Sequence, residues 1–254
     1  MTDAPASAPD RSITVARTQW LSPAMVRVIF TGERLEHPGS TDTYVKLIFD
    51  GVRRAYTVRW VEGSEFAIDF VVHGDEGLAG PWAAAAAPGD GLTYVGPGGD
   101  WSPRPAAGWH LFVGDESALP AIASGLDALL SIDPSAKALV FGEVETEQDH
   151  YPLPLAPNVR ATWVHRDGSP YGEALVAEVL AATFPAGDVE AFVHGNAEMV
   201  RPLRRYLLGD RGVPREHVSV SGYWRSGMTD EGWRASKREF NAAMEAETES
   251  GDRS

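Results

Sequence analysis

The first half of the chain contains many short runs of hydrophobic residues, several of which alternate with polar ones. These runs are rich in β-branched and aromatic residues, and turns with Gly, Pro, Asp or Ser separate them. This pattern is typical of antiparallel strands that close into a small barrel. The expected strands are residues 12–18, 25–31, 44–49, 54–60, 65–72 and 92–95.

After a stretch rich in Gly and Pro at residues 96–108, runs typical of strands alternate with runs of helical period. This alternation predicts a parallel sheet with helices on both faces, whose ligands lie beyond the carboxyl ends of the strands. The expected strands are residues 109–114, 138–143, 160–164, 189–195 and 218–223. The expected helices are residues 117–130, 172–182, 197–208 and 230–243.

The change of pattern divides the chain into domains. We expect an N-terminal antiparallel β-barrel at residues 10–105 and an α/β domain with a C-terminal helix at residues 106–244. The polar residues 245–254 are expected to form a disordered tail.

The N-terminal residues have neither the basic segment nor the apolar core of a signal peptide, and no apolar run approaches the length of a spanning helix. We therefore expect a cytoplasmic protein with no membrane partner, and we expect a monomer.

Composition removes several function classes. The formal net charge of −14 opposes binding to nucleic acid or to an anionic membrane, so an anionic ligand needs a local basic cluster. The chain has no cysteine, which excludes thiolate nucleophiles, iron–sulfur clusters and thiolate zinc sites. No HExxH, GxSxG or Walker A sequence is present, so we expect neither a bound metal nor hydrolase or P-loop chemistry.

A candidate binding motif begins the fourth expected strand. Arg54 offers a guanidinium for a phosphate, Tyr56 an aromatic face for a flat heterocycle, and Thr57 a hydroxyl for its polar edge. A surface arginine beside a half-buried strand tyrosine would explain the same residues, because short motifs often arise by chance.

The segment 73–83 follows the next strand and adds weight to the first motif. Glycines at 74, 77 and 80 allow a close approach of the backbone to a diphosphate, and a short helix is expected at residues 82–87. Together the two segments predict a flavin dinucleotide site. The alternative is a glycine-rich barrel loop with His73 as an ordinary core histidine.

Two turns of the second half have the strand–turn–helix form of a nucleotide-binding fold. The first contains Asp115 and Glu116, but it lacks the three-glycine fingerprint. The second contains Asn196, which an N-cap role explains equally well. Lys46 interrupts an apolar strand and either faces solvent or lines a pocket. Further basic residues lie at 225 and at 234–238.

Taken together, these motifs resemble the siderophore-interacting protein family, which consists of flavin-dependent ferric-siderophore reductases in the ferredoxin-reductase-like superfamily. The resemblance covers most of the chain, from about Thr14 to about Ala243. The matching segments are residues 45–47, 54–59, 73–74, 80–83, 88–90, 96–97, 113–121 and 222–227.

The resemblance implies an FAD-binding barrel and an NAD(P)H-binding-like domain, with the isoalloxazine ring at their junction. It assigns FAD contacts to Arg54, Tyr56, Thr57, His73, Gly80, Trp82, Ala83, Asp115 and Glu116. It assigns contacts with an anionic ferric chelate to Lys46, Arg225, Lys237 and Arg238. No side chain is expected to act as a catalytic acid, base or nucleophile, because electrons pass through the flavin.

The implied reaction is the reduction of Fe(III) to Fe(II) in a ferric siderophore, with electrons from NADH, NADPH or ferredoxin. Many members have Ala-Gly-Glu where this chain has His194-Gly195-Asn196, so the pyridine-nucleotide contacts of that turn are left open. Two alternatives remain: an oxidoreductase of the same superfamily with another electron acceptor, and a non-catalytic siderophore-binding protein.

Overall fold

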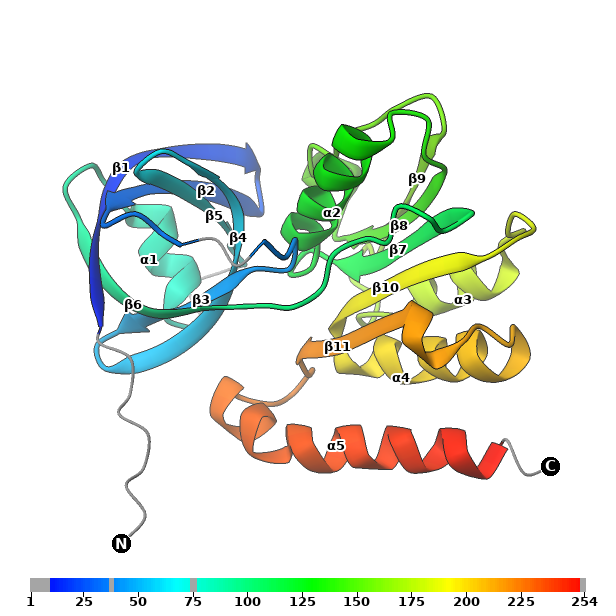
Figure 1. Cartoon of the computed structure of the whole chain (residues 1–254). Helices are drawn as coiled ribbons and strands as arrows, with labels where there is room; N and C mark the ends of the chain where they lie inside the picture. Colours follow the sequence, from blue (N-terminus) through cyan, green and yellow to red (C-terminus); the bar gives the residue numbers. More distant parts are fainter. Residues whose placement is uncertain (1–9, 37–38, 74–76, 252–254) are drawn as a thin grey trace, which may run out of the picture. The chain divides into compact units, whose positions relative to one another are not determined.

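The chain forms two compact units in a computed structural model, Met1–Ser102 and Pro103–Ser254 (Figure 1). The structure describes residues 10–36, 39–73 and 77–251. The predicted Gly74 of the binding loop and the last three residues of the predicted tail lie outside the described residues.

The first unit is a closed antiparallel barrel in the order β1-β2-β5-β4-β3-β6, which confirms the predicted fold class. Each expected strand is present, and most extend by one to four residues at an end. The strands are β1 Arg11–Ser22, β2 Met25–Gly32, β3 Tyr44–Phe49, β4 Val52–Glu62, β5 Glu65–Val71 and β6 Gly91–Gly98.

The barrel interior is filled by alternating side chains and by one short helix. In β3, Val45, Leu47 and Phe49 are buried while the residues between them are more exposed, which is the two-residue period of a strand with one face on the core. The helix α1, Ala79–Ala85, buries Ala79 and Ala83 in this core. It begins before the predicted residue 82, because alanine, glycine and proline are all compatible with a first helical turn.

The second unit contains a five-stranded parallel sheet in the order β11-β10-β7-β8-β9. The strands are β7 Trp109–Asp115, β8 Ala138–Val144, β9 Val159–His165, β10 Val189–Asn196 and β11 Val218–Trp224. Strands β7 and β10 are buried at every position, as expected for a sheet covered on both faces.

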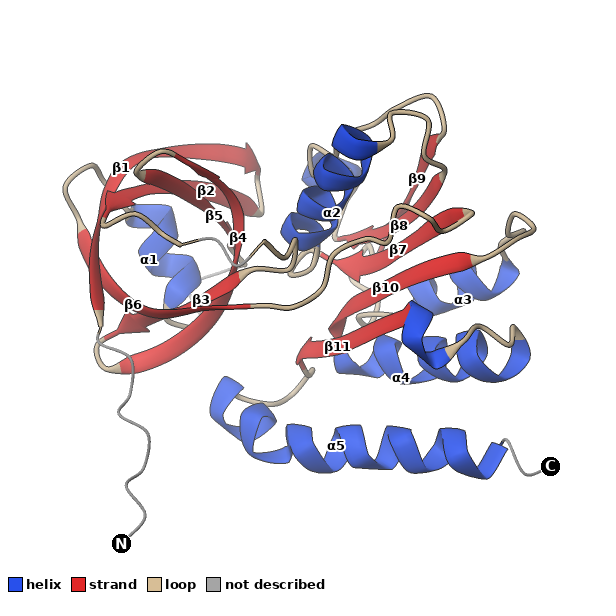
Figure 2. Cartoon of the chain, in the orientation of Figure 1, coloured by secondary structure: helices blue, strands red, loops and turns tan. Residues whose placement is uncertain are grey.

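Helices cover the two faces of this sheet (Figure 2). Helix α2, Leu119–Ile132, packs against the face that carries Gly114 and Gly142, and α3, Glu173–Ala181, and α4, Ala197–Arg205, pack against the other. A π-helical turn, η2 Tyr206–Asp210, continues α4. The short 3₁₀ helices η1 Glu147–Asp149 and η3 Arg215–His217 lie in connecting segments.

The last helix, α5 Asp230–Gly251, is longer than predicted. The prediction of a disordered tail is therefore wrong for residues 245–251. Three of those seven residues are Glu, a good helix former, and Glu247 forms an ion pair with Arg201 of α4. Near its start, Trp233 is buried and donates a 3.2 Å hydrogen bond to the carbonyl of Gly222. None of the helices in the described residues is long and apolar enough to span a bilayer.

Candidate functional site

Strand β4 presents the predicted motif on its two faces. Arg54 and Tyr56 pair across the ladder with Leu47 and Val45, which are buried, so their side chains lie on the core side of the strand. Thr57 pairs with the exposed Tyr44 and lies on the opposite side. The alternation of the strand thus separates the hydroxyl from the guanidinium and the aromatic ring.

An aromatic cluster supports Tyr56. Its ring centroid lies 4.5 Å from that of Phe70 in β5, and Phe70 lies 6.1 Å from Trp82 in α1. Trp82 also packs 5.5 Å from Phe49 and 6.2 Å from Phe30. The Trp82 side chain is therefore part of the barrel core, and packing fixes the position of Tyr56.

The loop residues predicted to bind a diphosphate lie at the end of β5 and the start of α1. His73 is exposed and lies two residues after the end of β5. A Cβ atom at Gly80 would lie 3.1 Å from the carbonyl oxygen of Val71, so glycine permits this close backbone contact. Ala83 is buried in the core, which leaves the backbone of the first turn of α1 as the part able to donate to a phosphate.

These barrel residues fit a flavin dinucleotide. Arg54 and Tyr56 share one face at i and i+2 spacing, and the first turn of α1 has no side-chain cap on its backbone N–H groups. A cation, an aromatic ring and donating amides are the groups that a diphosphate joined to a flat heterocycle requires.

Lys46 of β3 is exposed, so it takes the first of its two predicted positions and faces solvent. It pairs with Ala55 of β4 and with Val95 of β6, on the side of the barrel away from the buried Val45 and Leu47. Its ammonium group is thus presented on a rigid strand rather than on a loop.

In the second unit, Asp115 connects the carboxyl ends of three strands. Its Oδ2 atom accepts hydrogen bonds from the backbone N–H of Asn196 in β10 at 2.7 Å and from Nε1 of Trp224 in β11 at 2.9 Å. Its Oδ1 atom accepts from the backbone N–H and the hydroxyl of Ser117 at 3.0 and 2.5 Å. A Cβ at Gly195, which has a φ of +129°, would lie 2.7 Å from Oδ1, so glycine is required beside this carboxylate.

We expect the substitution Trp224→Phe to destabilise the second unit by about 1.5–3 kcal/mol, because it removes a hydrogen bond to a buried carboxylate while an aromatic ring stays at this position. Denaturant unfolding measures this loss. Trp20→Phe is the matched control, since Trp20 is 51% exposed. Equal stability of the two variants would contradict the role of Asp115 as a connecting residue.

Glu116, the neighbour of Asp115, belongs to a buried network of charges. Its carboxylate pairs with both terminal nitrogens of Arg166, which also contacts Glu143 at 3.2 Å and Glu145 at 3.1 Å. The guanidinium lies 3.9 Å from the centre of the Tyr171 ring. Glu143 in addition accepts the backbone N–H of Gly172 at 2.9 and 3.0 Å, so it joins β8 to the start of α3.

This network buries more acidic than basic groups, and the pKa values of its buried carboxyl groups are raised. Burial, with a smaller contribution from Asp115, raises the pKa of Glu116 to about 7 despite the pairing with Arg166. Burial also raises the pKa values of Asp115 and Glu143. Burial acts to lower the pKa of Arg166, but the pairing with Glu116 and the other anionic neighbours outweigh it and raise this pKa, so Arg166 stays charged.

The His194-Gly195-Asn196 turn has a structural explanation. Asn196 is the N-cap of α4, and its side-chain oxygen accepts the N–H of Glu198 at 2.7 Å. His194 is buried between the hydroxyls of Tyr223, 3.0 Å from Nδ1, and Ser219, 2.9 Å from Nε2. Burial lowers the pKa of His194 to about 3, so this imidazole is neutral near pH 7.

The basic residues predicted to bind a chelate differ in their surroundings. Arg225 forms a 2.7 Å ion pair with Glu198. Lys237 of α5 donates to the hydroxyl of Ser221 at 3.3 Å, and burial lowers its pKa. Arg238 is exposed.

Sequence reasoning did not find Arg166, Trp224 or His194 as contributors to the carboxyl ends of the strands. The local signal was their position, because each lies within two residues of the end of a predicted strand. The hydrogen-bond partner of Arg166 lies 50 residues away in sequence, that of Trp224 lies 109 residues away, and those of His194 lie 25 and 29 residues away. A local sequence pattern does not reveal partners at such separations.

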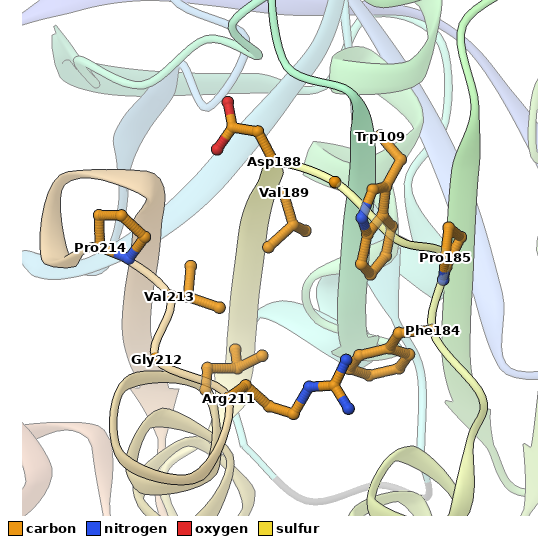
Figure 3. Close-up of a pocket in the computed structure, with 11 residues that line it drawn as sticks. Trp109, Phe184, Pro185, Asp188, Val189, Arg211, Gly212, Val213 and Pro214 are labelled. Atoms are coloured by element: carbon orange, nitrogen blue, oxygen red, sulfur yellow. The ribbon is translucent and has the colours of Figure 1, made fainter.

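A cavity of about 140 Å³ lies at the opposite end of this sheet, where β7 and β10 begin (Figure 3). Trp109, Phe184 and Val213 contribute to its wall, and the guanidinium of Arg211 lies 5.0 Å from the Phe184 ring. Ligands of open parallel sheets bind beyond the carboxyl ends of the strands, so this cavity is not part of the candidate site.

The ferredoxin reductase of carbazole 1,9a-dioxygenase has a similar fold and aligns with a TM-score of 0.70 and 18% identity, over 84% of this chain and 68% of that one. Residues 107–227 match the family model described as siderophore-interacting protein, and residues 50–101 match the model described as siderophore-interacting FAD-binding domain. The chain belongs to the siderophore-interacting protein family.

Three relatives illustrate the match. An uncharacterised protein of Mycobacterium tuberculosis is 38% identical in an alignment that covers 94% of this chain and 98% of that protein. The ferric vibriobactin reductase of Vibrio cholerae is 30% identical in an alignment that covers 88% of this chain and 92% of that protein. The crystal structure of a siderophore utilization protein from T. fusca aligns with a TM-score of 0.78 and 32% identity, over 87% of this chain and 95% of that one.

Proposed function

We propose that the protein is an FAD-dependent oxidoreductase that reduces Fe(III) to Fe(II) in ferric siderophores. The observation that carries this proposal is the placement of Arg54 and Tyr56 on the core side of β4, within the part of the barrel that matches a siderophore-interacting FAD-binding domain. FAD is the bound cofactor, and a nicotinamide nucleotide or a ferredoxin supplies the electrons. The protein acts as a monomer in the cytoplasm, where these donors are found.

The residues of the barrel have separate tasks in this proposal. Arg54 binds the diphosphate and Tyr56 lies against the ring, both from the core side of β4. Thr57 reaches the polar edge of the ring from the other side of the strand. His73 lies beside the ring, while the backbone at Gly80, Trp82 and Ala83 approaches the phosphates. In the second unit, Asp115 and Glu116 contribute to cofactor binding mainly by holding the carboxyl ends of the strands in place.

The bound flavin supplies the conversion of a two-electron donor into single-electron transfer. Siderophores bind Fe(III) through hard oxygen donors, so reduction weakens the complex and releases Fe(II). The protein has to bind, orient and shield the reactants, and no side chain has to act as nucleophile or acid. Lys46, Arg225, Lys237 and Arg238 provide the positive charge for the anionic chelate.

The test is anaerobic spectroscopy. The purified protein should show flavin absorption bands, which bleach when NADH, NADPH or reduced ferredoxin is added and return when a ferric siderophore follows. The same assay with ferricyanide and quinones measures the preference for the acceptor. Protein that shows no flavin bands after incubation with FAD would falsify the proposal, and equal turnover with every acceptor would identify a general flavin oxidoreductase instead.

Lys46→Glu should lower kcat/KM for ferric-siderophore reduction roughly fivefold or more, equivalent to about 1 kcal/mol, because it reverses a charge that attracts the chelate. The flavin content should not change. Lys137→Glu is the matched control: Lys137 is also exposed and the change in net charge is the same. If the two variants reduce the chelate equally well, Lys46 is not part of the chelate site.

A further inference from the structure

Two histidines of the second unit meet with their ring nitrogens facing each other. Nε2 of His150 lies 2.8 Å from Nε2 of His165, and the ring planes differ by 17°. The ring centroids are 5.1 Å apart, so both Nε2 atoms lie close to the line that joins the two rings. One Nε2–H donates to the other Nε2 in this arrangement, and neither residue has a role in the proposed flavin site.

The local structure fixes both rings. His165 ends β9, the edge strand of the sheet. His150 follows the 3₁₀ helix η1, where Asp149 accepts hydrogen bonds from the backbone N–H of Thr146 at 3.1 Å and from its hydroxyl at 2.7 Å. The His150 ring stacks on Trp163 of β9 with centroids 4.6 Å apart and planes at 16°. Rotation of the His150 ring would break this stack, so the two nitrogens are held together.

The electrostatic surroundings favour the neutral form that binds metals. Burial, followed by the neighbouring His165, lowers the pKa of His150, while the nearby carboxylates of Glu147 and Asp149 act in the opposite direction. A neutral imidazole presents a lone pair to a metal ion as soon as its proton lies on Nδ1. Both side chains are partly exposed, so an ion can reach them from solvent.

We propose that His150 and His165 bind one divalent late first-row transition-metal ion, such as Ni²⁺, Cu²⁺ or Zn²⁺, through their Nε2 atoms. Imidazole suits these ions, and metal–nitrogen bonds of about 2.0–2.1 Å in tetrahedral geometry place two ligand nitrogens about 3.3 Å apart. The pair therefore has to open by about 0.5 Å, and both rings have to turn toward an ion that lies off the line joining the two nitrogens.

The site has two protein ligands. Within residues 10–36, 39–73 and 77–251, no group of three or more metal-ligating side chains occurs, so water completes the coordination. Such a site binds its ion exchangeably, unlike a closed structural site with four protein ligands. Fe(II) belongs to the same chemical class but stands lower in the affinity order than Ni²⁺ or Cu²⁺. The site does not depend on the proposed function.

Calorimetric titration of the tag-free full-length protein with NiCl₂ at pH 7.5 tests the proposal. We expect one binding site in the wild type, and at least tenfold weaker binding in His150→Gln and in His165→Gln separately. His217→Gln is the matched control, because His217 is partly exposed but lies at a distant end of the sheet beside Asp188. Thermal unfolding of each variant establishes that it is folded.

A second measurement is independent of substitution. Addition of ZnCl₂ to the wild type should shift the imidazole ¹⁵N resonances of two histidines together, and both shifts should be absent in His165→Gln. The proposal is overturned if the wild type does not bind Ni²⁺ at millimolar concentration, if both glutamine variants bind it as tightly as the wild type, or if Zn²⁺ perturbs other histidines instead.

Discussion

Replacement of Arg166 by methionine should destabilise the second unit by about 3–5 kcal/mol at pH 8, the largest loss of stability that we expect from a single substitution in this chain. Arg166 is the cation that Glu116, Glu143 and Glu145 share, and its side chain is almost completely buried. Methionine has a similar length and fills the space, so the loss measures the cost of leaving buried carboxylates without their partner.

The pH dependence identifies the cause. The folded state holds the Glu116 proton up to about pH 7, whereas an unfolded chain releases it near the ordinary value of 4.5. The contribution of this group to stability is therefore complete below the unfolded pKa and is lost as pH rises through 7. Without Arg166, the pKa values of Glu116 and Glu143 should rise further. The deficit of the variant relative to wild type should then grow between pH 6 and pH 8.5.

Denaturant unfolding of both proteins at these two pH values measures the effect. Arg234→Met is the matched control, because Arg234 pairs with Asp230 at 2.7 Å on the exposed surface of α5 and its removal should cost less than about 1 kcal/mol at either pH. A deficit of Arg166→Met that is independent of pH would mean that lost packing, rather than unpaired charge, causes the destabilisation.

The fold was predictable because its signals are local. The alternation of Val45, Leu47 and Phe49 with exposed residues identifies β3 to the residue, and the continuous apolar run of β7 identifies a strand buried on both faces. The order of the strands was not predictable, because cross-strand pairs such as Arg27 with Asp69 join residues that are 42 positions apart. The end of α5 was misjudged because polarity was interpreted as disorder, although Glu and Ala favour helix.

The candidate site was predictable only in part, because some of its contacts join residues that are far apart in the sequence. The sequence indicates Arg54, Tyr56 and Lys46, since their strand positions can be counted. It does not show that Asp115 accepts hydrogen bonds from β10 and β11, or that Glu116 pairs with Arg166. These two acidic residues, first considered for direct contact with a ligand, have their hydrogen-bonding capacity largely occupied within the protein. Their most direct effect is on the geometry of the strand ends.

Arg54→Ala should weaken FAD binding about 100-fold. A guanidinium that binds a phosphate bidentately makes two charge-assisted hydrogen bonds, and the loss of about 3 kcal/mol corresponds to that factor in the dissociation constant. The barrel should stay folded, because Arg54 is only partly buried and its pairing partner Leu47 keeps its place in the core. Titration of the apoprotein with FAD, followed by flavin fluorescence, measures the change.

The neighbouring residue provides the matched control. Arg53 pairs with Ile48 and therefore lies on the other side of β4, so Arg53→Ala removes the same charge from the same strand without removing the proposed phosphate contact. We expect FAD binding within about twofold of wild type in Arg53→Ala, since a screened surface charge contributes little. Arg54→Lys should restore only part of the affinity, because an ammonium cannot form the two parallel bonds of a guanidinium. Equal loss in Arg53→Ala and Arg54→Ala would show that general electrostatic attraction, and not a face-specific phosphate contact, brings FAD to the barrel.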